Sequence, residues 1–312
     1  MDLIVERITD LTDRIREIRL VSESMPLPPW TPGAHLDFDL GAAGKRSYSL
    51  IDWTGNTKAP QHYTIAVQRE DDGEGGSTAM HALAVGDTVT VAEPKNDFEL
   101  TSADAPIYLV AGGIGVTPLI SMAASLSAGS RPFRLLYACR SSSVAAYAEE
   151  LSRFGDAFVL HPDDAAAIDL IAVAQEAAIS EAHLYVCGPK GMIDAARSAA
   201  EDASIPADRV HVELFSTPAA PTGDQPFEVE IQDTGQVFTI PPGQTIISVL
   251  NAAGIDLIYD CQRGDCGICQ VDVIDGIPDH RDVVLTDAEK AKNDVMQICV
   301  SRAKSPRLVL DI

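Results

Sequence analysis

Four cysteines near the C-terminus constrain this 312-residue chain more than any other feature. Cys261, Cys266 and Cys269 have the spacing C-x4-C-x2-C, and Cys299 follows after a gap. This is the ligand spacing of plant-type [2Fe–2S] centres. Two irons bridged by two sulfides need four thiolates from opposite sides, so one loop can supply three of them and the fourth must come from elsewhere in the fold.

A structural zinc site is the alternative for these cysteines. Zinc sites usually combine two C-x2-C units, and Cys261 and Cys266 are too far apart for that pattern. Gly264 and Gly267 would let the loop curl tightly, with its backbone N–H groups facing the sulfurs. The sequence therefore predicts four iron ligands in a centre that carries electrons one at a time.

Length and composition limit the remaining possibilities. A chain of 312 residues should hold two or three domains, and a hydrophobic content of 46% is enough for real cores. The net charge of −23 argues against a nucleic-acid partner. Cys139 and Cys187 are far apart, so they imply no disulfide framework, and the N-terminus has no signal-peptide pattern. We therefore expect a cytoplasmic protein.

Residues 105–130 contain no charged side chain and could imitate a membrane span. Gly112, Gly113, Gly115 and Pro118 interrupt this stretch at its middle. We therefore expect a strand, a loop and a helix here, and no membrane association.

Residues 1 to about 100 are predicted to be all-β. The runs 35–40, 62–67 and 88–91 alternate as strands do, which favours a barrel or sandwich. Arg46, Tyr48 and Ser49 lie on one extended segment, where residues 46 and 48 share a face and 49 points away. The sequence Gly75-Gly-Ser-Thr78 precedes a helical stretch and could form a phosphate-binding nest, although such runs are more often ordinary loops.

Residues from about 104 to 215 alternate between strand and helix patterns, which predicts a doubly wound parallel sheet with ligands at the carboxyl ends of its strands. The expected strands are 107–111, 133–138, 157–160, 183–187 and 210–215, and the expected helices are 119–126, 144–154, 164–178 and one ending near 203. The loop 112–118 is where a dinucleotide pyrophosphate would bind, but it lacks the full G-x-G-x-x-G and could be a plain tight turn.

The composition of residues 216–226 indicates a linker. Beyond it we expect a hairpin (227–232 and 236–240), a helix at 246–253 and the cysteine loop. Thr286 and Glu289 have capping-box spacing for a short helix, and residues 307–312 should close the sheet.

Together these motifs resemble those of the phthalate dioxygenase reductase-like family, which includes the vanillate O-demethylase reductases. The shared motifs, in order, are Arg46-x-Tyr48-Ser49, Gly75-Gly76-Ser77, Gly112-Gly-Ile-Gly-Val-Thr-Pro118, Cys187-Gly-Pro189, Glu213-Leu-Phe215 and the cysteine loop. The resemblance implies a multidomain α+β and α/β fold. It comprises an antiparallel β-barrel flavin domain (1–102), a doubly wound parallel-sheet NAD(P)-binding domain (103–217), a linker (218–226) and a C-terminal β-grasp [2Fe–2S] ferredoxin domain (227–312).

The resemblance also implies the site residues. Arg46 would bind the flavin phosphate, Tyr48 would pack on the isoalloxazine and Ser49 would hydrogen-bond near N5. The implied catalytic residues are Ser49, Cys187, Glu213 and Phe215, and the implied iron ligands are Cys261, Cys266, Cys269 and Cys299. The implied cofactor-binding residues are Arg46, Tyr48, Ser49, Leu50, Gly75, Gly76, Ser77, Thr78, Gly112, Gly113, Gly115, Thr117, Pro118, Arg140, Cys187, Gly188, Pro189 and Phe215.

Alternatives remain for several of these residues. Cys187 could be a small buried core residue, and Glu213 could be a structural hydrogen-bonding group. The second strand of the nucleotide domain ends in Arg140 and three serines, where NAD-binding proteins often have an acid, so NADPH remains an alternative to NADH. Arg263, near Cys266, could contact the electron-transfer partner, but a solvated loop charge is the preferred interpretation.

The activity that the resemblance implies is electron transfer from NADH. Hydride would pass to the N5 atom of FMN, and single electrons would then pass through the [2Fe–2S] cluster to a separate Rieske-type oxygenase acting on an aromatic substrate. FMN in place of FAD rests on the resemblance alone. The protein is expected to be a monomer. The alternative functions are a reductase for another acceptor, such as a diiron hydroxylase, and a redox sensor.

Overall fold

The computed structural model describes residues 1–55, 57–71, 73, 75–215 and 223–312. These residues form two compact units, Met1–His211 and Val212–Ile312. The division falls inside the strand β11 (Val210–Glu213), so the second unit begins before the predicted end of the nucleotide domain at residue 217. Residues 218–222 of the predicted linker lie outside the described residues.

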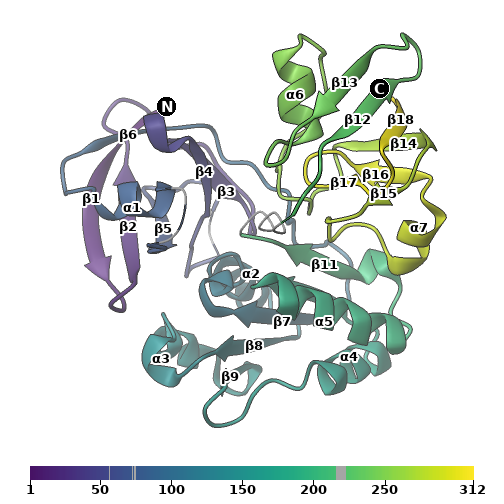
Figure 1. Cartoon of the computed structure of the whole chain (residues 1–312). Coiled ribbons are helices and arrows are strands. Elements are labelled where there is room, and N and C mark those ends of the chain that lie inside the picture. Colours follow the sequence, from purple (N-terminus) through teal and green to yellow (C-terminus); the bar gives the residue numbers. More distant parts are fainter. Residues whose placement is uncertain (56, 72, 74, 216–222) are drawn as a thin grey trace. The chain divides into compact units, whose positions relative to one another are not determined.

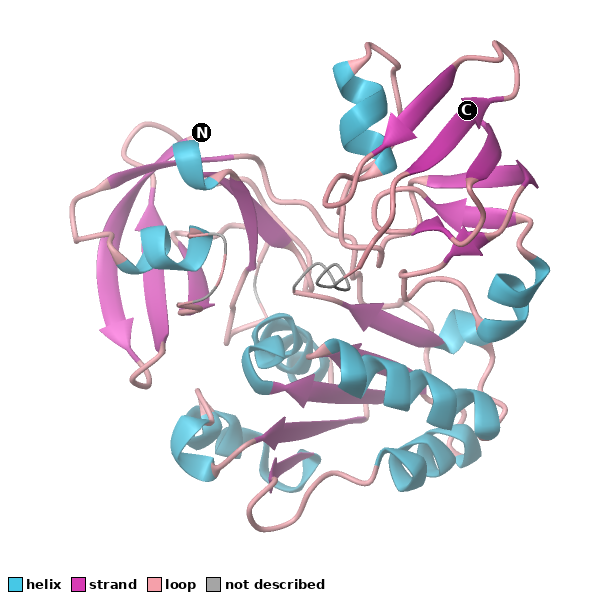
Figure 2. Cartoon of the chain, viewed as in Figure 1, coloured by secondary structure: helices cyan, strands magenta, loops and turns pink. Residues whose placement is uncertain are grey.

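The N-terminal part of the first unit is an antiparallel β domain, as expected from the alternating sequence (Figures 1 and 2). Its sheet has the order β4-β3-β6-β1-β2-β5. The strands are β1 (Asp2–Asp10), β2 (Ile15–Val21), β3 (His35–Asp39), β4 (Lys45–Ser49), β5 (Tyr63–Gln68) and β6 (Thr88–Val91), with the helix α1 (Gly76–His81) after β5. The burial of β6 alternates along the strand, with Val89 and Val91 facing the core.

The rest of the first unit is the predicted nucleotide domain. Its sheet has the order β11-β10-β7-β8-β9, and β7, β8, β9 and β10 pair in parallel. Besides β11, the strands are β7 (Ile107–Gly112), β8 (Phe133–Cys139), β9 (Phe158–Pro162) and β10 (His183–Cys187). The helices are α2 (Val116–Ala128), α3 (Ala148–Leu151), α4 (Leu170–Ile179) and α5 (Lys190–Asp202).

Two helices of this domain are shorter than the sequence suggested. The helix expected at 164–178 begins at Leu170, because the Asp169 carboxylate accepts hydrogen bonds from the N–H groups of Ile171 (3.1 Å) and Ala172 (3.0 Å) and so caps the helix there. The helix expected at 144–154 is reduced to α3. The left-handed backbone of Tyr147 (φ 62°) precedes it, and Gly155 (φ 56°) interrupts the 3-10 turn that follows.

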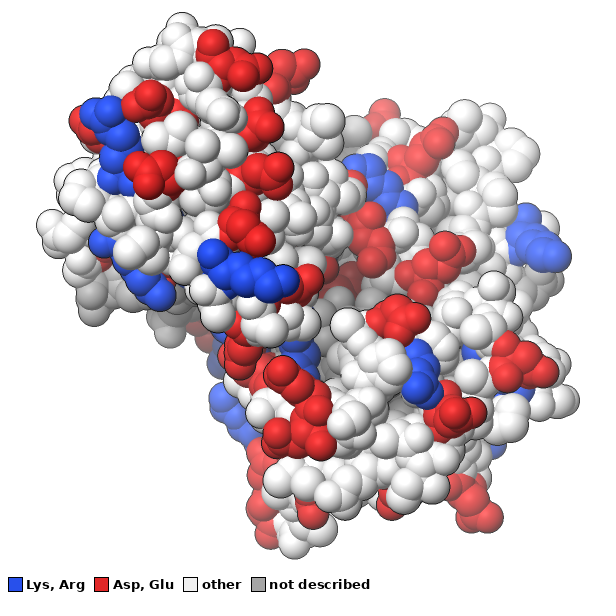
Figure 3. Space-filling model, turned by 90° about the vertical axis from the view of Figure 1, so that its right-hand side faces the viewer, with Lys and Arg blue, Asp and Glu red and all other residues white. Residues whose placement is uncertain are grey.

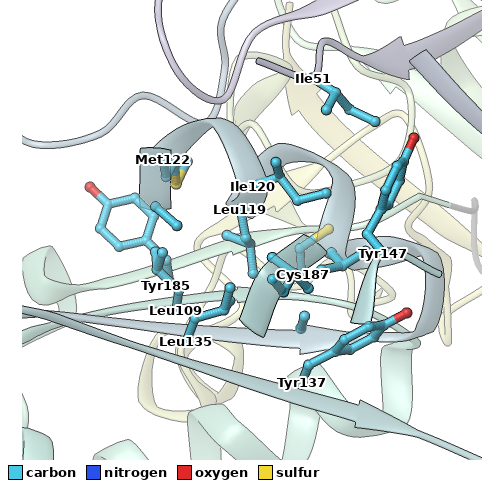
Figure 4. Close-up of a cluster of buried hydrophobic side chains, with 14 of the residues drawn as sticks. Ile51, Leu109, Leu119, Ile120, Met122, Leu135, Tyr137, Tyr147, Tyr185 and Cys187 are labelled. Carbon is cyan, nitrogen blue, oxygen red and sulfur yellow. The ribbon is translucent and has the colours of Figure 1, made fainter. Parts of the chain in front are cut away.

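The two parts of the first unit share one hydrophobic core, part of which is drawn in Figure 4. Ile51, which follows β4, belongs to the same cluster as Leu119 and Ile120 of α2 and the sheet residues beneath them. The Ser121 hydroxyl donates to the Leu50 carbonyl (2.8 Å) and accepts from the Asp52 N–H (2.9 Å). These contacts fix the segment that leaves the proposed flavin-binding strand against α2.

The second unit contains a mixed five-stranded sheet with the order β13-β12-β18-β14-β16. Strands β12 and β18 pair in parallel, and the other neighbouring strands of this sheet pair antiparallel. The strands are β12 (Phe227–Ile231), β13 (Val237–Ile240), β14 (Gln270–Asp275), β15 (Pro278–Asp279), β16 (Val295–Gln297), β17 (Arg302–Ala303) and β18 (Arg307–Asp311), and the helices are α6 (Ile246–Ala252) and α7 (Asp287–Lys292). Thr286 and Glu289 form the predicted capping box at the start of α7.

Ion pairs attach Asp224, which precedes β12, to the second unit. The Arg281 guanidinium donates to both carboxylate oxygens of Asp224, at 2.9 and 2.6 Å. The Arg302 Nε lies 3.3 Å from the same carboxylate. This arrangement is a bidentate pair reinforced by a second cation.

The charge-free residues 105–130 form β7, a 3-10 turn and α2, as expected. Within the described part of the chain, no helix combines the length and the apolar character that a membrane span requires. Acidic side chains are spread over the face shown in Figure 3 and do not form a single block.

Candidate functional site

The second unit brings the four predicted iron ligands together. Hydrogen bonding with Cys266 and Cys299 lowers the pKa of the Cys261 thiol, and hydrogen bonding with Cys261 and Cys269 raises the pKa of Cys299. Hydrogen-bonding contacts thus connect the sulfur atoms of all four cysteines. The described Cys, His, Asp and Glu residues include no group of three suited to one metal ion. Pairs of thiols, Cys261 with Cys266 and Cys269 with Cys299, suit a centre of two irons that takes four thiolates.

The cysteine loop has the tight conformation that its glycines suggested. Gly264 (φ 83°) and Gly267 (φ 79°) are both left-handed. A Cβ atom on Gly264 would lie only 2.6 Å from Cγ2 of Val300, so the loop also needs glycine for space. The Arg263 N–H points to the Cys261 sulfur at 3.3 Å, which is the backbone-to-sulfur bond expected around a cluster.

Two buried polar residues support the cysteine loop and were not predicted from the sequence. Asp282 accepts hydrogen bonds from the N–H groups of Val284 (3.2 Å) and Leu285 (2.8 Å) and shapes the segment whose Val283 N–H binds the Gly264 carbonyl. The Gln297 amide oxygen lies 3.5 Å from the Cys269 sulfur. Neither residue belongs to a local motif, because each reaches the loop only through the fold.

Arg263 is not the solvated charge that the sequence suggested. Its side chain is only 15% exposed and lies 3.4 Å from the carboxylate of Asp265, whose side chain is 4% exposed. Asp265 also accepts a hydrogen bond of 2.8 Å from the Leu214 N–H. Burial raises the pKa of the Asp265 carboxyl to about 7, although the charge of Arg263 opposes this shift.

The first unit places Arg46 of β4 directly on Gly76 at the start of α1. A Cβ atom on Gly76 would lie 2.6 Å from both Cγ and Nε of Arg46, so this packing requires glycine. Two predicted phosphate-binding elements that are thirty positions apart in the chain therefore lie side by side. A guanidinium beside a glycine-rich turn suits a phosphate monoester, which is the group that FMN carries.

The other predicted flavin residues lie on the same structural elements. Tyr48 is partly buried, makes an edge-to-face contact with Phe38 at 5.5 Å, and has its pKa raised by burial to about 12. Ser49 is buried at the end of β4. The Ser77 hydroxyl accepts from the Glu70 N–H at 3.0 Å, so in this structure it closes the loop between β5 and α1. Thr78 and Ser77 both lie on α1, and the N-cap residue of this helix is Gly75, which has left-handed backbone geometry.

The predicted nucleotide loop lies against the Cys187-Gly-Pro segment. A Cβ atom on Gly115 would lie 2.2 Å from the carbonyl oxygen of Cys187, and one on Gly188 would lie 3.0 Å from the Gly112 Cα. Gly113 is left-handed (φ 56°) and faces open space. The backbone between β7 and α2 therefore lies next to the end of β10, and parallel sheets of this kind bind ligands at the carboxyl ends of their strands.

Two further nucleotide-loop residues shape the start of α2. The Thr117 hydroxyl is buried and donates to the Ile114 carbonyl at 3.1 Å, so it stabilises the loop. Pro118 is a buried residue of the first turn of α2, a position that tolerates proline. Pro189 is the N-cap residue of α5.

Cys187, Glu213 and Phe215 are the predicted catalytic residues besides Ser49. Cys187 ends β10 in the first unit and is fully buried in the shared core. Glu213 and Phe215 belong to the second unit, where Glu213 is buried and Phe215 is 37% exposed. The Leu214 N–H between them binds Asp265.

The ends of β8 and β9 define the surroundings of Arg140. Arg140 is exposed after β8, and the hydroxyls of Ser141 and Ser143 lie 2.9 Å apart. The Asp163 N–H donates to the Cys139 carbonyl at 2.8 Å, and the charges of Asp163 and Asp164 help burial to raise the pKa of Cys139. The acid that the sequence of β8 lacks is therefore present at the end of the neighbouring strand.

A nucleotide-binding parallel sheet and a loop of four cysteines define this chain as an iron–sulfur oxidoreductase. The model of the 2Fe-2S iron-sulfur cluster binding domain matches residues 229–304, and that of the oxidoreductase NAD-binding domain matches residues 109–198. The chain is 44% identical to a vanillate O-demethylase oxidoreductase of Pseudomonas sp. (strain HR199 / DSM 7063), over 92% of this chain and 91% of that one. It is 39% identical to a tetrachlorobenzoquinone reductase of Sphingobium chlorophenolicum, over 100% of this chain and 98% of that one.

A solved structure of phthalate dioxygenase reductase superposes with a TM-score of 0.74 and 34% identity, over 100% of this chain and 98% of the other. That protein is described as a modular structure for electron transfer from pyridine nucleotides to [2Fe–2S]. The chain belongs to the phthalate dioxygenase reductase-like family. The fold class predicted from the sequence is confirmed, and the chain is an NAD-binding [2Fe–2S] oxidoreductase.

Proposed function

We propose that this protein is the NADH-dependent reductase component of a Rieske-type aromatic oxygenase or O-demethylase system. The observation that carries the proposal is the presence in one chain of two assembled sites. One is the nucleotide loop packed on the end of β10, and the other is the loop with four neighbouring thiols. When bound, FMN accepts a hydride and releases its electrons singly to the [2Fe–2S] cluster.

The chain's own residues bind and orient these groups. Arg46 and the turn beginning at Gly75 hold the flavin phosphate, and Tyr48 and Ser49 border the ring system. Gly113, Gly115 and Thr117 receive the dinucleotide, with Cys187 near the nicotinamide and Phe215 at its ring. Cys261, Cys266, Cys269 and Cys299 ligate the irons. The contact of Arg46 with Gly76 and that of Gly115 with Cys187 support this assignment.

We propose four parts for the chain, with boundaries after residues 102, 217 and 226. The proposed partner is a separate oxygenase, and its support is the name of the vanillate O-demethylase relative. We also propose a cytoplasmic monomer. The flavin is proposed to be FMN on the family resemblance, and the adjacency of Arg46 and Gly76 supports a flavin phosphate at this place.

The test is to purify the protein without exposure to air, to determine its cofactors and then to reconstitute the electron path. One flavin, two irons and two acid-labile sulfides per chain are expected, and the released flavin should be FMN. With NADH the protein should drive an aromatic Rieske oxygenase encoded beside it. Zinc in place of iron, or the absence of flavin, would refute the proposal.

A second candidate acceptor is a quinone, which the relative named tetrachlorobenzoquinone reductase favours because it covers the whole of this chain. The two candidate functions differ in the cofactor that passes electrons to the acceptor. Quinone reduction that persists at the parental rate after loss of the cluster would support the quinone, because the flavin could then serve as the donor. Oxygenase reduction that requires the cluster would support the oxygenase.

A further inference from the structure

Gln297 is a buried polar residue beside one of the predicted iron ligands. It is the last residue of β16 and is 0% exposed. Its amide oxygen lies 3.5 Å from the Cys269 sulfur, and its amide nitrogen donates to the side-chain oxygen of Gln270 at 3.0 Å. Gln270 and Gln297 are cross-strand partners on β14 and β16, so both contacts lie within the second unit. The Gln297 amide is therefore held between a ligand sulfur and a second amide.

The orientation of this amide depends on the protonation state of Cys269. In the structure the Cys269 thiol donates its proton to the Gln297 oxygen. A cysteine that ligates iron is a thiolate, which accepts hydrogen bonds and has no proton to donate. With its orientation unchanged, the amide oxygen would face a negatively charged sulfur at a place that water does not reach, and the contact would be repulsive. Half a turn of the amide removes the repulsion, because it presents an N–H group to the sulfur.

Gln270 allows the Gln297 amide to turn over without the loss of a hydrogen bond. Gln270 is exposed, so its own amide can rotate. When both amides have turned over, the Gln270 nitrogen donates to the Gln297 oxygen across the same 3.0 Å contact. The buried amide thus keeps both of its partners in either orientation.

We propose that Gln297 donates an N–H···S hydrogen bond to Cys269 when the cluster is bound, and that this bond raises the reduction potential of the [2Fe–2S] centre. Hydrogen bonds to the sulfurs are one of the factors that set the potentials of such centres. Reduction adds a negative charge to the centre, so a donor at a ligand sulfur stabilises the reduced state more than the oxidised state. The inference concerns the [2Fe–2S] domain at residues 229–304 and does not depend on which acceptor receives the electrons.

The first test is a potentiometric titration of the cluster. Gln297→Leu has a similar volume and lacks a donor. Its equilibrium constant for cluster reduction should fall about tenfold, which is a shift of about −59 mV for one electron. Gln270→Ala is the matched control, since it removes the second amide but leaves Gln297 beside the sulfur, and it should stay within about twofold of the parent. A parental potential in Gln297→Leu would overturn the proposal.

Pulsed EPR of the reduced protein supplies a readout that is independent of potential and turnover. With the side-chain nitrogen of glutamine labelled as ¹⁵N, the parent and Gln270→Ala should show isotropic hyperfine coupling to one such nitrogen, transmitted through the N–H···S bond. Gln297→Leu should show none. If Gln297→Leu fails to hold iron, the parent alone decides, because the absence of coupling in the parent would mean that the amide oxygen still faces the sulfur and would overturn the proposal.

The proposed function fails in a different way. Zinc in place of iron in the parental protein would refute the proposed function whatever the glutamine variants do. An iron-loaded parent that transfers electrons from NADH but lacks the coupling to Gln297 would overturn only the inference about this residue.

Discussion

The hydroxyl of Tyr147 donates a 2.8 Å hydrogen bond to the carboxylate of Glu17, across 130 positions of sequence. Glu17 lies on β2 and also pairs with Arg7 at 3.3 Å, whereas Tyr147 precedes α3 in the nucleotide domain. The tyrosine adopts left-handed backbone geometry, a strain that its buried contacts, including an edge-to-face contact with Trp53, offset.

Tyr147→Phe should therefore destabilise the first unit by about 1–3 kcal/mol, because the buried Glu17 loses a donor that water cannot replace. Tyr137→Phe is the matched control, since Tyr137 is buried in the same core and no side chain of the described chain bonds its hydroxyl. The control should cost less than about 1 kcal/mol. Denaturant unfolding followed by flavin release measures both, and equal losses would contradict the assigned role of the bond.

Cys269→Ser should remove the cluster, because it replaces one of four neighbouring thiols with a weaker iron ligand. Reduction of cytochrome c or the oxygenase should fall by more than about tenfold. Reduction of ferricyanide, which can take electrons from the flavin directly, should persist at about the parental rate, because the flavin site is unchanged. Cys139→Ser changes a buried cysteine outside the loop and should keep full iron content. Parental oxygenase reduction without a cluster would show that the electron path is wrong.

Gly76→Ala should weaken flavin binding, because its Cβ would overlap the Arg46 side chain. If the overpacking cost of about 1–3 kcal/mol falls on flavin binding, the affinity should fall by about 5-fold to 150-fold, measured as flavin retained after dialysis. Gly191→Ala, at the start of α5, meets no atom within 4 Å and should retain flavin as the parent does. If flavin affinity is unchanged in Gly76→Ala, the packing of Arg46 on Gly76 does not form the flavin phosphate site.

NADH should be preferred to NADPH in kcat/KM, because the carboxylates of Asp163 and Asp164 lie close enough to Cys139 to raise its pKa and would repel a 2′-phosphate. Asp163→Ser should improve the use of NADPH by about fivefold or more, since one unit charge is removed near the site. Arg140→Ala should lower whatever NADPH activity remains. Better use of NADPH than of NADH by the parent would assign Arg140 to the 2′-phosphate.

Asp224→Asn should destabilise the second unit, since hydrogen bonding to Arg281 lowers the pKa of Asp224 below its ordinary value of 3.8. A depressed folded-state pKa gives a stabilisation that is complete above pH 3.8 and is lost as the pH falls through the folded-state value. The difference in Tm between parent and variant should therefore be largest near pH 7 and shrink below pH 4, the region of the ordinary carboxyl pKa. Asp233→Asn, at an exposed position, is the control. A difference that grows on acidification would contradict the pairing.

The sequence predicted the features that depend on local patterns. The capping box of Thr286, the parallel alternation of β7 to β10 and the curl of the cysteine loop follow from spacing, period and glycine placement. Helix starts were less predictable, because an alanine-rich run has no clear beginning until a cap such as Asp169 is placed.

The contacts that assemble the sites could not be predicted in the same way. Arg46 on Gly76 and Gly115 on the Cys187 carbonyl depend on how strands from distant parts of the chain pair. Asp265 and Arg263 look like solvated loop charges because their partners, the Leu214 peptide and each other's side chains, become apparent only after folding. Polar groups that become buried through the fold leave no periodic signal.

The carboxylates of Asp224 and Asp265 attach two separate stretches of the chain to the second unit. Asp224 is held by the guanidinium groups of Arg281 and Arg302, and Asp265 accepts the Leu214 N–H. Hydrogen bonds that involve an ionised group are roughly twice as strong as those between neutral groups. The attachment of Leu214 and Asp224 to the unit that carries the cysteine loop therefore depends on charge as well as on packing, and it weakens when these carboxylates are protonated.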